Sequence, residues 1–203
     1  MRRLQAAFVI TVIAIVGLSA IGVFAAFLRV APLVGLPKTD FVGPSRTSGT
    51  SFDAATRELT VRAIPLSTTF GPGAMRAVTA PKSLDIKIRI LDHAAASVAS
   101  VDGPDVVLIG EIDQDGDGIT DHSGVLLTGE VLAVGVQAFA GPTDSMDLTF
   151  RVTGGSLMSL FSGRDLGVNL TMDGSTFTGD FSASFSGGAK GALGAISCGG
   201  TCN

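Results

Sequence analysis

The stretch VVLIGEIDQDGDGITD, residues 106–121, joins an apolar run rich in β-branched residues to a loop of alternating aspartates. A second apolar run follows at 124–131. Apolar runs of this length, bounded by Gly and Asp, predict buried strands, and a short connection between two of them predicts a hairpin. We therefore expect two neighbouring antiparallel strands with the acidic loop as their connection.

The loop carries carboxylates at its positions 1, 3, 5 and 9, from Asp113, Asp115, Asp117 and Asp121. Calcium takes about six to eight oxygen ligands, and alternate aspartates on a curled loop can converge on one ion. A glycine at position 6 permits a sharp turn, and Ile119 at position 7 would offer its backbone carbonyl. The sequence therefore predicts a Ca²⁺ site from these five residues. A solvated acidic turn is the alternative, because Asp and Gly favour turns without any ion.

The nine residues 113–121 resemble the aspartate-rich repeats of thrombospondin type 3, and the first half of a dockerin or EF-hand loop. This resemblance implies a calcium loop and no particular fold. Position 12, where an EF-hand supplies a bidentate glutamate, is Gly124 here. A water molecule, a nearby carboxylate such as Glu111, or no ligand at all would take that place, which implies weak binding, with a dissociation constant of roughly 10⁻⁴–10⁻³ M.

Several other segments of the chain also have the residue patterns of strands. Apolar and charged residues alternate at 83–91, and a hairpin signal joins 50–53 to 58–63. We expect further strands at 132–139, 147–153, 167–172 and 178–185, and a short helical turn at 157–161. The 27 glycines also favour a turn-rich β protein over a helical bundle. The predicted fold class is all-β, an antiparallel sandwich or barrel-like domain preceded by one N-terminal apolar helix.

The N-terminus has the features of an export signal or a membrane anchor. Arg2 and Arg3 precede 25 residues without a charge, residues 4–28. At about 1.5 Å per residue, such a helix spans a hydrocarbon core of about 30 Å, and the arginines favour a cytoplasmic N-terminus. A signal peptide cleaved after 23–25 is the alternative to an anchor. In both cases the rest of the chain is expected outside the cytoplasm, either membrane-anchored or secreted.

Composition divides the chain into four predicted parts. Residues 1–29 form the signal peptide or transmembrane anchor, and residues 30–48, with three prolines, form a flexible linker. Residues 49–188 form the β domain, and residues 189–203 form a Gly-rich tail. Cys198 and Cys202, the two cysteines of the chain, are expected to form a disulfide outside the cytoplasm. So short a loop would pin the tail locally and add little to the stability of the domain.

Charge excludes one class of partner. Residues 91–150 contain eleven acidic side chains and no Lys or Arg. Nucleic acid is therefore not an expected partner, because phosphate binding needs a basic surface. The expected partners are the membrane, through the N-terminal helix, and an extracellular carbohydrate or protein.

Few residues point to catalysis. Glu111 and Glu130 lie in similar predicted strands, and two carboxylates are the groups of a glycoside hydrolase, but the chain has no Trp or Tyr to stack on a sugar ring. His122 follows Asp121 and could join a metal site, although a solvent-facing loop position is the interpretation we favour; the other histidine is His93. No nucleophile motif and no phosphate-binding glycine loop occurs.

We therefore expect an exported, membrane-tethered or secreted β domain with a structural calcium site, acting as a surface or matrix component without catalytic activity. Its segments 52–61, 124–129 and 150–157 loosely resemble Gly-, Ser- and Phe-rich β domains of exported bacterial surface proteins, for which no activity is implied. The alternative functions are a carbohydrate- or protein-binding surface module and, third, a glycoside hydrolase.

Overall fold

The computed structural model describes residues 34–93, 97–139 and 141–196. The predicted N-terminal helix and the Cys198 and Cys202 pair lie outside these residues. No helix in the described part of the chain has the length and apolar character needed to cross a membrane.

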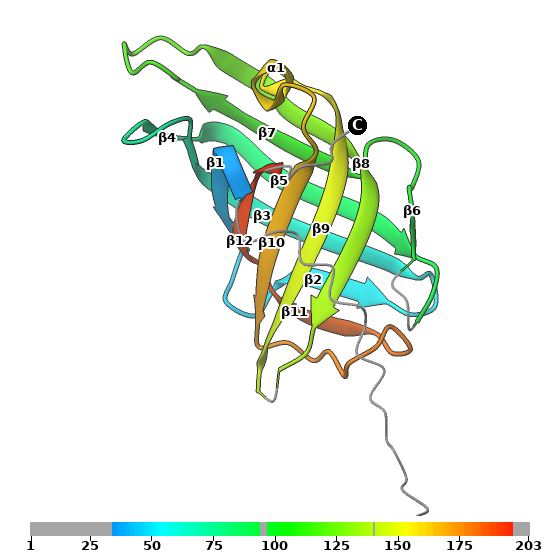
Figure 1. Cartoon of the computed structure of the whole chain (residues 1–203). Coiled ribbons are helices and arrows are strands. Elements are labelled where there is room, and N and C mark those ends of the chain that lie inside the picture. Colours follow the sequence, from blue (N-terminus) through cyan, green and yellow to red (C-terminus); the bar gives the residue numbers. More distant parts are fainter. Residues whose placement is uncertain (1–33, 94–96, 140, 197–203) are drawn as a thin grey trace, which may run out of the picture.

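Eight antiparallel strands close into a β-barrel (Figure 1). In order around the barrel they are β1 (Val34–Val42), β12 (Lys190–Ile196), β10 (Leu166–Asp173), β9 (Thr143–Gly154), β8 (His122–Gln137), β7 (Val106–Ile112), β5 (Thr79–Ile90) and β3 (Glu58–Thr69). β3 pairs with β1 as well as with β5, which completes the circle. The all-β, barrel-like class predicted from the sequence is confirmed.

Two of the barrel positions are shared by pairs of shorter strands. β2 (Gly49–Asp53) pairs with the first half of β3, and β1 pairs with the second half. Beside them, β11 (Phe185–Gly188) pairs with β2, and β12 pairs with β1. β1 and β2 therefore behave as one long, interrupted strand, and β11 and β12 as another. Three short elements complete the fold, β4 (Met75–Ala77), β6 (Val98–Ala99) and α1 (Met158–Phe161).

The barrel interior is filled by the apolar members of the alternating strands. In β7 every second residue is buried, beginning with Val106 and ending with Ile112. β5 follows the same rule from Leu84 to Ile90, while its Asp85 and Lys87 face solvent. Side chains suffice to fill a barrel of eight strands, so the interior is a packed core.

The predicted linker at 30–48 is wrong for residues 34–42, which form β1. Phe41 is buried in the core, and β1 pairs on both sides, with β3 and β12. Pro37 is accommodated because the pairing with β12 shifts register between Gly35 and Lys38, and a proline is tolerated at such a bulge. The proline and glycine content of residues 30–48 predicts a flexible linker, because it does not reveal the pairing of β1 with distant strands.

The predicted Gly-rich tail at 189–203 is wrong for residues 190–196, which form β12. Leu193 and Ala195 are buried in the core, and Gly191 on the same strand leaves room for the backbone of β10. The β domain therefore extends over at least residues 34–196, beyond the predicted bounds of 49–188.

Most of the other predicted elements are confirmed, including the 50–53 and 58–63 hairpin, the strands at 83–91, 147–153 and 167–172, and the turn at 157–161. Two predictions are corrected. The runs 124–131 and 132–137 are strand as predicted, but they form one continuous strand, β8, with bulges. Residues 178–184 form no strand, because Phe177 and Phe181 turn inward to pack with Phe52 and Phe185.

Candidate metal centre

The aspartate loop, residues 113–121, connects β7 to β8 at the tip of their hairpin (Figure 1). In that pairing Ile112 lies opposite His122 and Gly110 lies opposite Gly124. The backbone N–H of Asp121 donates to the carbonyl of Ile112 at 3.0 Å, which closes the base of the loop. The prediction of two antiparallel neighbours joined by the acidic loop is confirmed.

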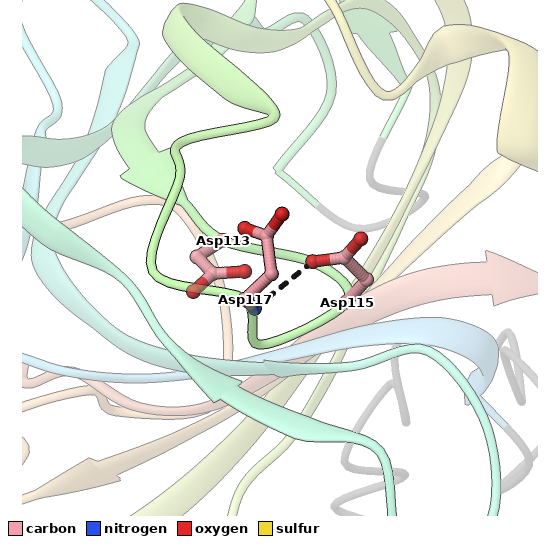
Figure 2. A group of neighbouring side chains, drawn as sticks. All are labelled: Asp113, Asp115 and Asp117. Atoms are coloured by element: carbon pink, nitrogen blue, oxygen red, sulfur yellow. Dashed lines mark hydrogen bonds between the residues drawn. The ribbon is translucent and has the colours of Figure 1, made fainter.

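Three carboxylates gather within this loop. Asp113, Asp115 and Asp117 each offer an oxygen, and these oxygens all lie within 4.8 Å of one another (Figure 2). Asp113 is half-buried, and the other two side chains are exposed. The structure thus brings together the residues predicted for positions 1, 3 and 5.

Backbone N–H groups hold these carboxylates in place. Asp113 accepts hydrogen bonds from Gly116 at 2.6 Å and from Gly118 at 2.8 Å. Asp115 accepts from the N–H of Asp117 at 3.0 Å, the bond drawn in Figure 2, and Asp117 accepts from that of Ile119 at 2.7 Å. The bond from Gly118, followed by weaker ones, lowers the pKa of the Asp113 carboxyl below its ordinary value. This group is therefore anionic at neutral pH.

The two glycines of the loop provide the curvature. Gly116 and Gly118 have φ angles of 87° and 91°, in the region that L side chains rarely adopt. In this alternating sequence the aspartates supply the gathered oxygens, and the glycines supply the backbone curvature that brings them together.

Asp121 stands apart from the three gathered carboxylates in this structure. Its Oδ2 accepts the N–H groups of Gln114 at 2.6 Å and Asp115 at 3.3 Å, and it is not one of the three gathered carboxylates. Through these bonds the last residue of the loop holds the backbone of its second and third residues. The Ile119 side chain, 68 % exposed, is a hydrocarbon without a ligating atom, so this position could contribute only its backbone carbonyl to an ion.

Arg76, on β4, is a residue of this site that sequence reasoning missed. Its Nε donates to the carbonyl of Gln114 at 3.2 Å, and its Nη2 donates to that of Asp115 at 2.9 Å. The guanidinium therefore supports the loop through its backbone and leaves the carboxylates without an ion pair. Ion pairs elsewhere join Lys38 to Asp40, Lys87 to Glu58 and Lys190 to Asp173.

The two histidines lie outside the carboxylate group. His122 is half-buried at the start of β8, with its Nε2 2.8 Å from Oε1 of Gln114 and its ring beside Phe70. The predicted solvent-facing position is therefore wrong. His93 contacts the carbonyl of Phe181 through Nδ1 at 2.6 Å, and this contact ties a loop to the barrel.

Glu111 and Glu130 are too far apart to act together. Glu111 lies opposite Ser123, and Glu130 lies seven residues further along the same strand. At about 3.3 Å per residue the separation exceeds roughly 20 Å, whereas the two carboxyls of a glycoside hydrolase are about 5–10 Å apart. The glycoside hydrolase hypothesis is therefore wrong for this pair.

Comparisons of the chain with models of protein families, with curated proteins and with solved structures found no match. The aspartate loop is the feature of the barrel that indicates a function. A cluster of anionic oxygens without a positive partner, on a backbone already curled, is suited to a hard cation that prefers oxygen ligands.

Proposed function

We propose that this protein is an exported β-barrel whose aspartate loop binds one Ca²⁺ ion, and that it serves as a non-catalytic surface or matrix component. The observation that carries the proposal is the convergence of the Asp113, Asp115 and Asp117 oxygens within 4.8 Å of one another. The ion would be held by these carboxylates and by the carbonyl of Ile119, with Asp121 supporting the loop or completing the shell.

Calcium fits this loop better than magnesium. Mg²⁺ needs near-octahedral geometry and keeps most of its waters, whereas Ca²⁺ accepts irregular shells of carboxylate, carbonyl and water oxygens. An exposed loop with three gathered carboxylates offers an incomplete and irregular shell of this kind. Because three like charges repel one another, a bound cation would relieve their repulsion and stabilise the end of the β7–β8 hairpin.

The experiment is urea unfolding of the full chain in CaCl₂, in MgCl₂ and in EDTA. An ion that binds only the folded state stabilises it by about 2.7 kcal/mol when its concentration is 100 times the dissociation constant. We expect calcium to raise the urea midpoint clearly and magnesium to raise it less. Equal midpoints in calcium and in chelator would contradict the proposal.

A matched pair of variants assigns the effect to the loop. The double variant Asp113→Asn with Asp117→Asn removes two of the gathered carboxylates and should abolish the calcium-dependent increment. Asp102→Asn removes an exposed carboxylate outside the loop and should keep it. If both variants respond to calcium alike, the ion binds elsewhere.

Export is proposed from the basic and apolar N-terminal sequence alone. N-terminal sequencing of the protein recovered from outside the cytoplasm separates a cleaved signal peptide from a retained anchor. Recovery of the whole chain from the cytoplasm only would contradict this part of the proposal.

A protein-binding surface module is the second candidate. Val42 and Ile64 face each other across β1 and β3 on the outside of the barrel and are 36 % and 40 % exposed. Leu66, two residues further along β3, is also exposed. Three neighbouring apolar side chains on an outer face are what a protein partner could cover.

A further inference from the structure

Val42, Ile64 and Leu66 form one apolar patch on the outer wall of the barrel, which we call the β1–β3 apolar face. Val42 on β1 lies opposite Ile64 on β3, and Leu66 is the next outward residue of β3. The neighbours Phe41 and Ala63 are buried, so the two strands turn the three side chains of the face toward the outside. Adjacent exposed apolar side chains of this kind mark a surface that another surface covers.

Basic side chains lie on both sides of the β1–β3 apolar face. Arg62 precedes it by two residues on the same side of β3, and Lys190 on β12 lies opposite Val42. Two acids balance these charges nearby, because Asp85 lies opposite Arg62 and Asp173 lies 3.8 Å from Lys190. The immediate surroundings of the face are therefore neutral.

Over the whole barrel, however, positive and negative charges are separated. Residues 34–90 carry eight Lys or Arg and four Asp or Glu, whereas residues 91–150 carry eleven acidic side chains and no Lys or Arg. The strands β1, β3 and β5 from the first segment are neighbours in the barrel, and β7, β8 and β9 lie side by side on the opposite wall. An anionic surface therefore attracts the β1–β3 wall and repels the acidic wall.

The chain that precedes β1 limits the distance between this wall and a membrane. In the anchored form of the proposed function, on which this inference rests, residues 4–28 cross the bilayer and five residues, 29–33, remain before β1. An extended chain reaches at most about 3.3–3.6 Å per residue, so the start of β1 lies within about 20 Å of the lipid surface. The strand tethered in this way is one of the two that carry the β1–β3 apolar face.

We propose that the barrel lies with its β1–β3 wall against the membrane that holds its anchor, and that the β1–β3 apolar face contacts anionic lipid. Val42, Ile64 and Leu66 enter the boundary between the headgroups and the acyl chains, while Arg62 and Lys190 lie at the level of the lipid phosphates. The acidic wall of β7, β8 and β9 faces away from the lipid.

The test is Trp fluorescence of the full chain in vesicles of phosphatidylcholine and phosphatidylglycerol that contain a lipid with a nitroxide quencher on its headgroup. The chain has no Trp, so Ile64→Trp reports on the β1–β3 apolar face alone. Leu132→Trp on β8 is the matched control, because the two side chains are 40 % and 39 % exposed. Quenching should be several-fold stronger in Ile64→Trp, and the difference should shrink in vesicles of phosphatidylcholine alone. Equal quenching of the two variants would overturn the proposal.

Flotation of the same vesicles separates this inference from the proposed anchor. A chain that does not float with the vesicles contradicts the anchor, and this inference falls with it. A chain that floats while both variants are quenched alike keeps the anchor and refutes only the contact of the β1–β3 wall with lipid. That second result would leave the β1–β3 apolar face to a protein partner.

A second substitution in the Ile64→Trp background tests the apolar contact itself. Leu66→Asn should weaken the quenching about twofold or more, because it places a polar amide where the lipid boundary favours an apolar side chain. Val125→Asn on β8 is the control, since Val125 and Leu66 are 44 % and 46 % exposed, and it should leave the quenching unchanged. Quenching that Leu66→Asn does not reduce would contradict a contact through this face.

An independent reporter covers the case in which a variant does not fold. Val42→Trp, from the other strand of the face, should be quenched as strongly as Ile64→Trp, and circular dichroism reports whether each variant keeps its sheet. Weak quenching of a folded Val42→Trp variant, at the level of Leu132→Trp, would overturn the proposal.

Discussion

Asp147 shows how a single ionisable group can limit the stability of the barrel at neutral pH. It lies on β9, and its carboxylate accepts a hydrogen bond from the Asn169 amide of β10 at 2.6 Å. Burial disfavours the charged form and raises the pKa of this carboxyl from 3.8 to about 6. One hydrogen bond from a neutral amide does not offset that cost.

The consequence is a defined pH dependence. Because the folded pKa is above the unfolded one, proton binding at Asp147 stabilises the fold fully below pH 4, and this contribution is lost as the pH rises through about 6. Asp147→Asn keeps a hydrogen-bond acceptor without the charge. We expect the variant to match the wild type near pH 4 and to be more stable by about 1–3 kcal/mol at pH 7, measured by urea unfolding. A constant difference across this range would contradict the assignment.

Gly191 is a position where only glycine fits. A Cβ added there would lie 1.8 Å from the backbone carbonyl oxygen of Asn169 on the neighbouring strand. We expect Gly191→Ala to lower the free energy of unfolding by at least about 2 kcal/mol, since β10 and β12 would have to separate locally. Gly71→Ala is the control, because nothing lies within 4 Å of its Cβ. A variant at 191 as stable as the control would show that the strands adjust freely.

Among the elements, the β4 strand and the aspartate loop depend on each other through Arg76. Its two hydrogen bonds to the carbonyls of Gln114 and Asp115 support the loop in the absence of any ion. Arg76→Gln should therefore accelerate hydrogen exchange of the loop amides of Gly116, Gly118 and Ile119 by about tenfold or more. Amides of β10 should not change, and Arg89→Gln, an exposed arginine on β5, should have no effect on the loop. Unaltered exchange in the Arg76 variant would mean that the aspartates hold the loop alone.

Sequence patterns predicted this loop well where the information is local. The spacing of Asp113, Asp115 and Asp117 and the pairing of β7 with β8 are properties of one continuous stretch, and both appear in the structure. The contribution of Arg76 was missed because it comes from a strand 38 residues away from Gln114. The bracing role of Asp121 was missed because carboxylate spacing does not distinguish a ligand from a hydrogen-bond acceptor.

At the scale of the whole molecule, ring closure should make unfolding cooperative. Every barrel strand has two neighbours, so no strand can leave without breaking pairings on both sides. The chain has no Trp or Tyr, so single replacements such as Phe70→Trp and Phe177→Trp give isolated fluorescence reporters of two regions. We expect their urea transitions to coincide within about 0.2 M, as for a two-state domain. Midpoints that differ clearly would indicate that one part of the barrel opens first.

Closure also explains which parts of the fold were mispredicted. The prolines and glycines of residues 34–42 and 190–196 do not predict strands. These residues form strands because they pair with segments far away in the sequence. Phe41 and Leu193 are buried only because β1 and β12 pair with each other and with β3 and β10. By contrast, Leu84 and Ile86 belong to a strand whose alternation is evident from its own residues.

The pairing of β1 with β12 has a consequence for synthesis on the ribosome. Residue 34 emerges early, yet its partner at residue 196 is translated more than 160 residues later. Until then the nascent chain presents one edge of β1 and one edge of β10 without their final neighbour, and such unpaired edges invite association with other chains. The closing step therefore has to wait until β12 has been made, and until then the nascent chain must be kept apart from other copies of itself.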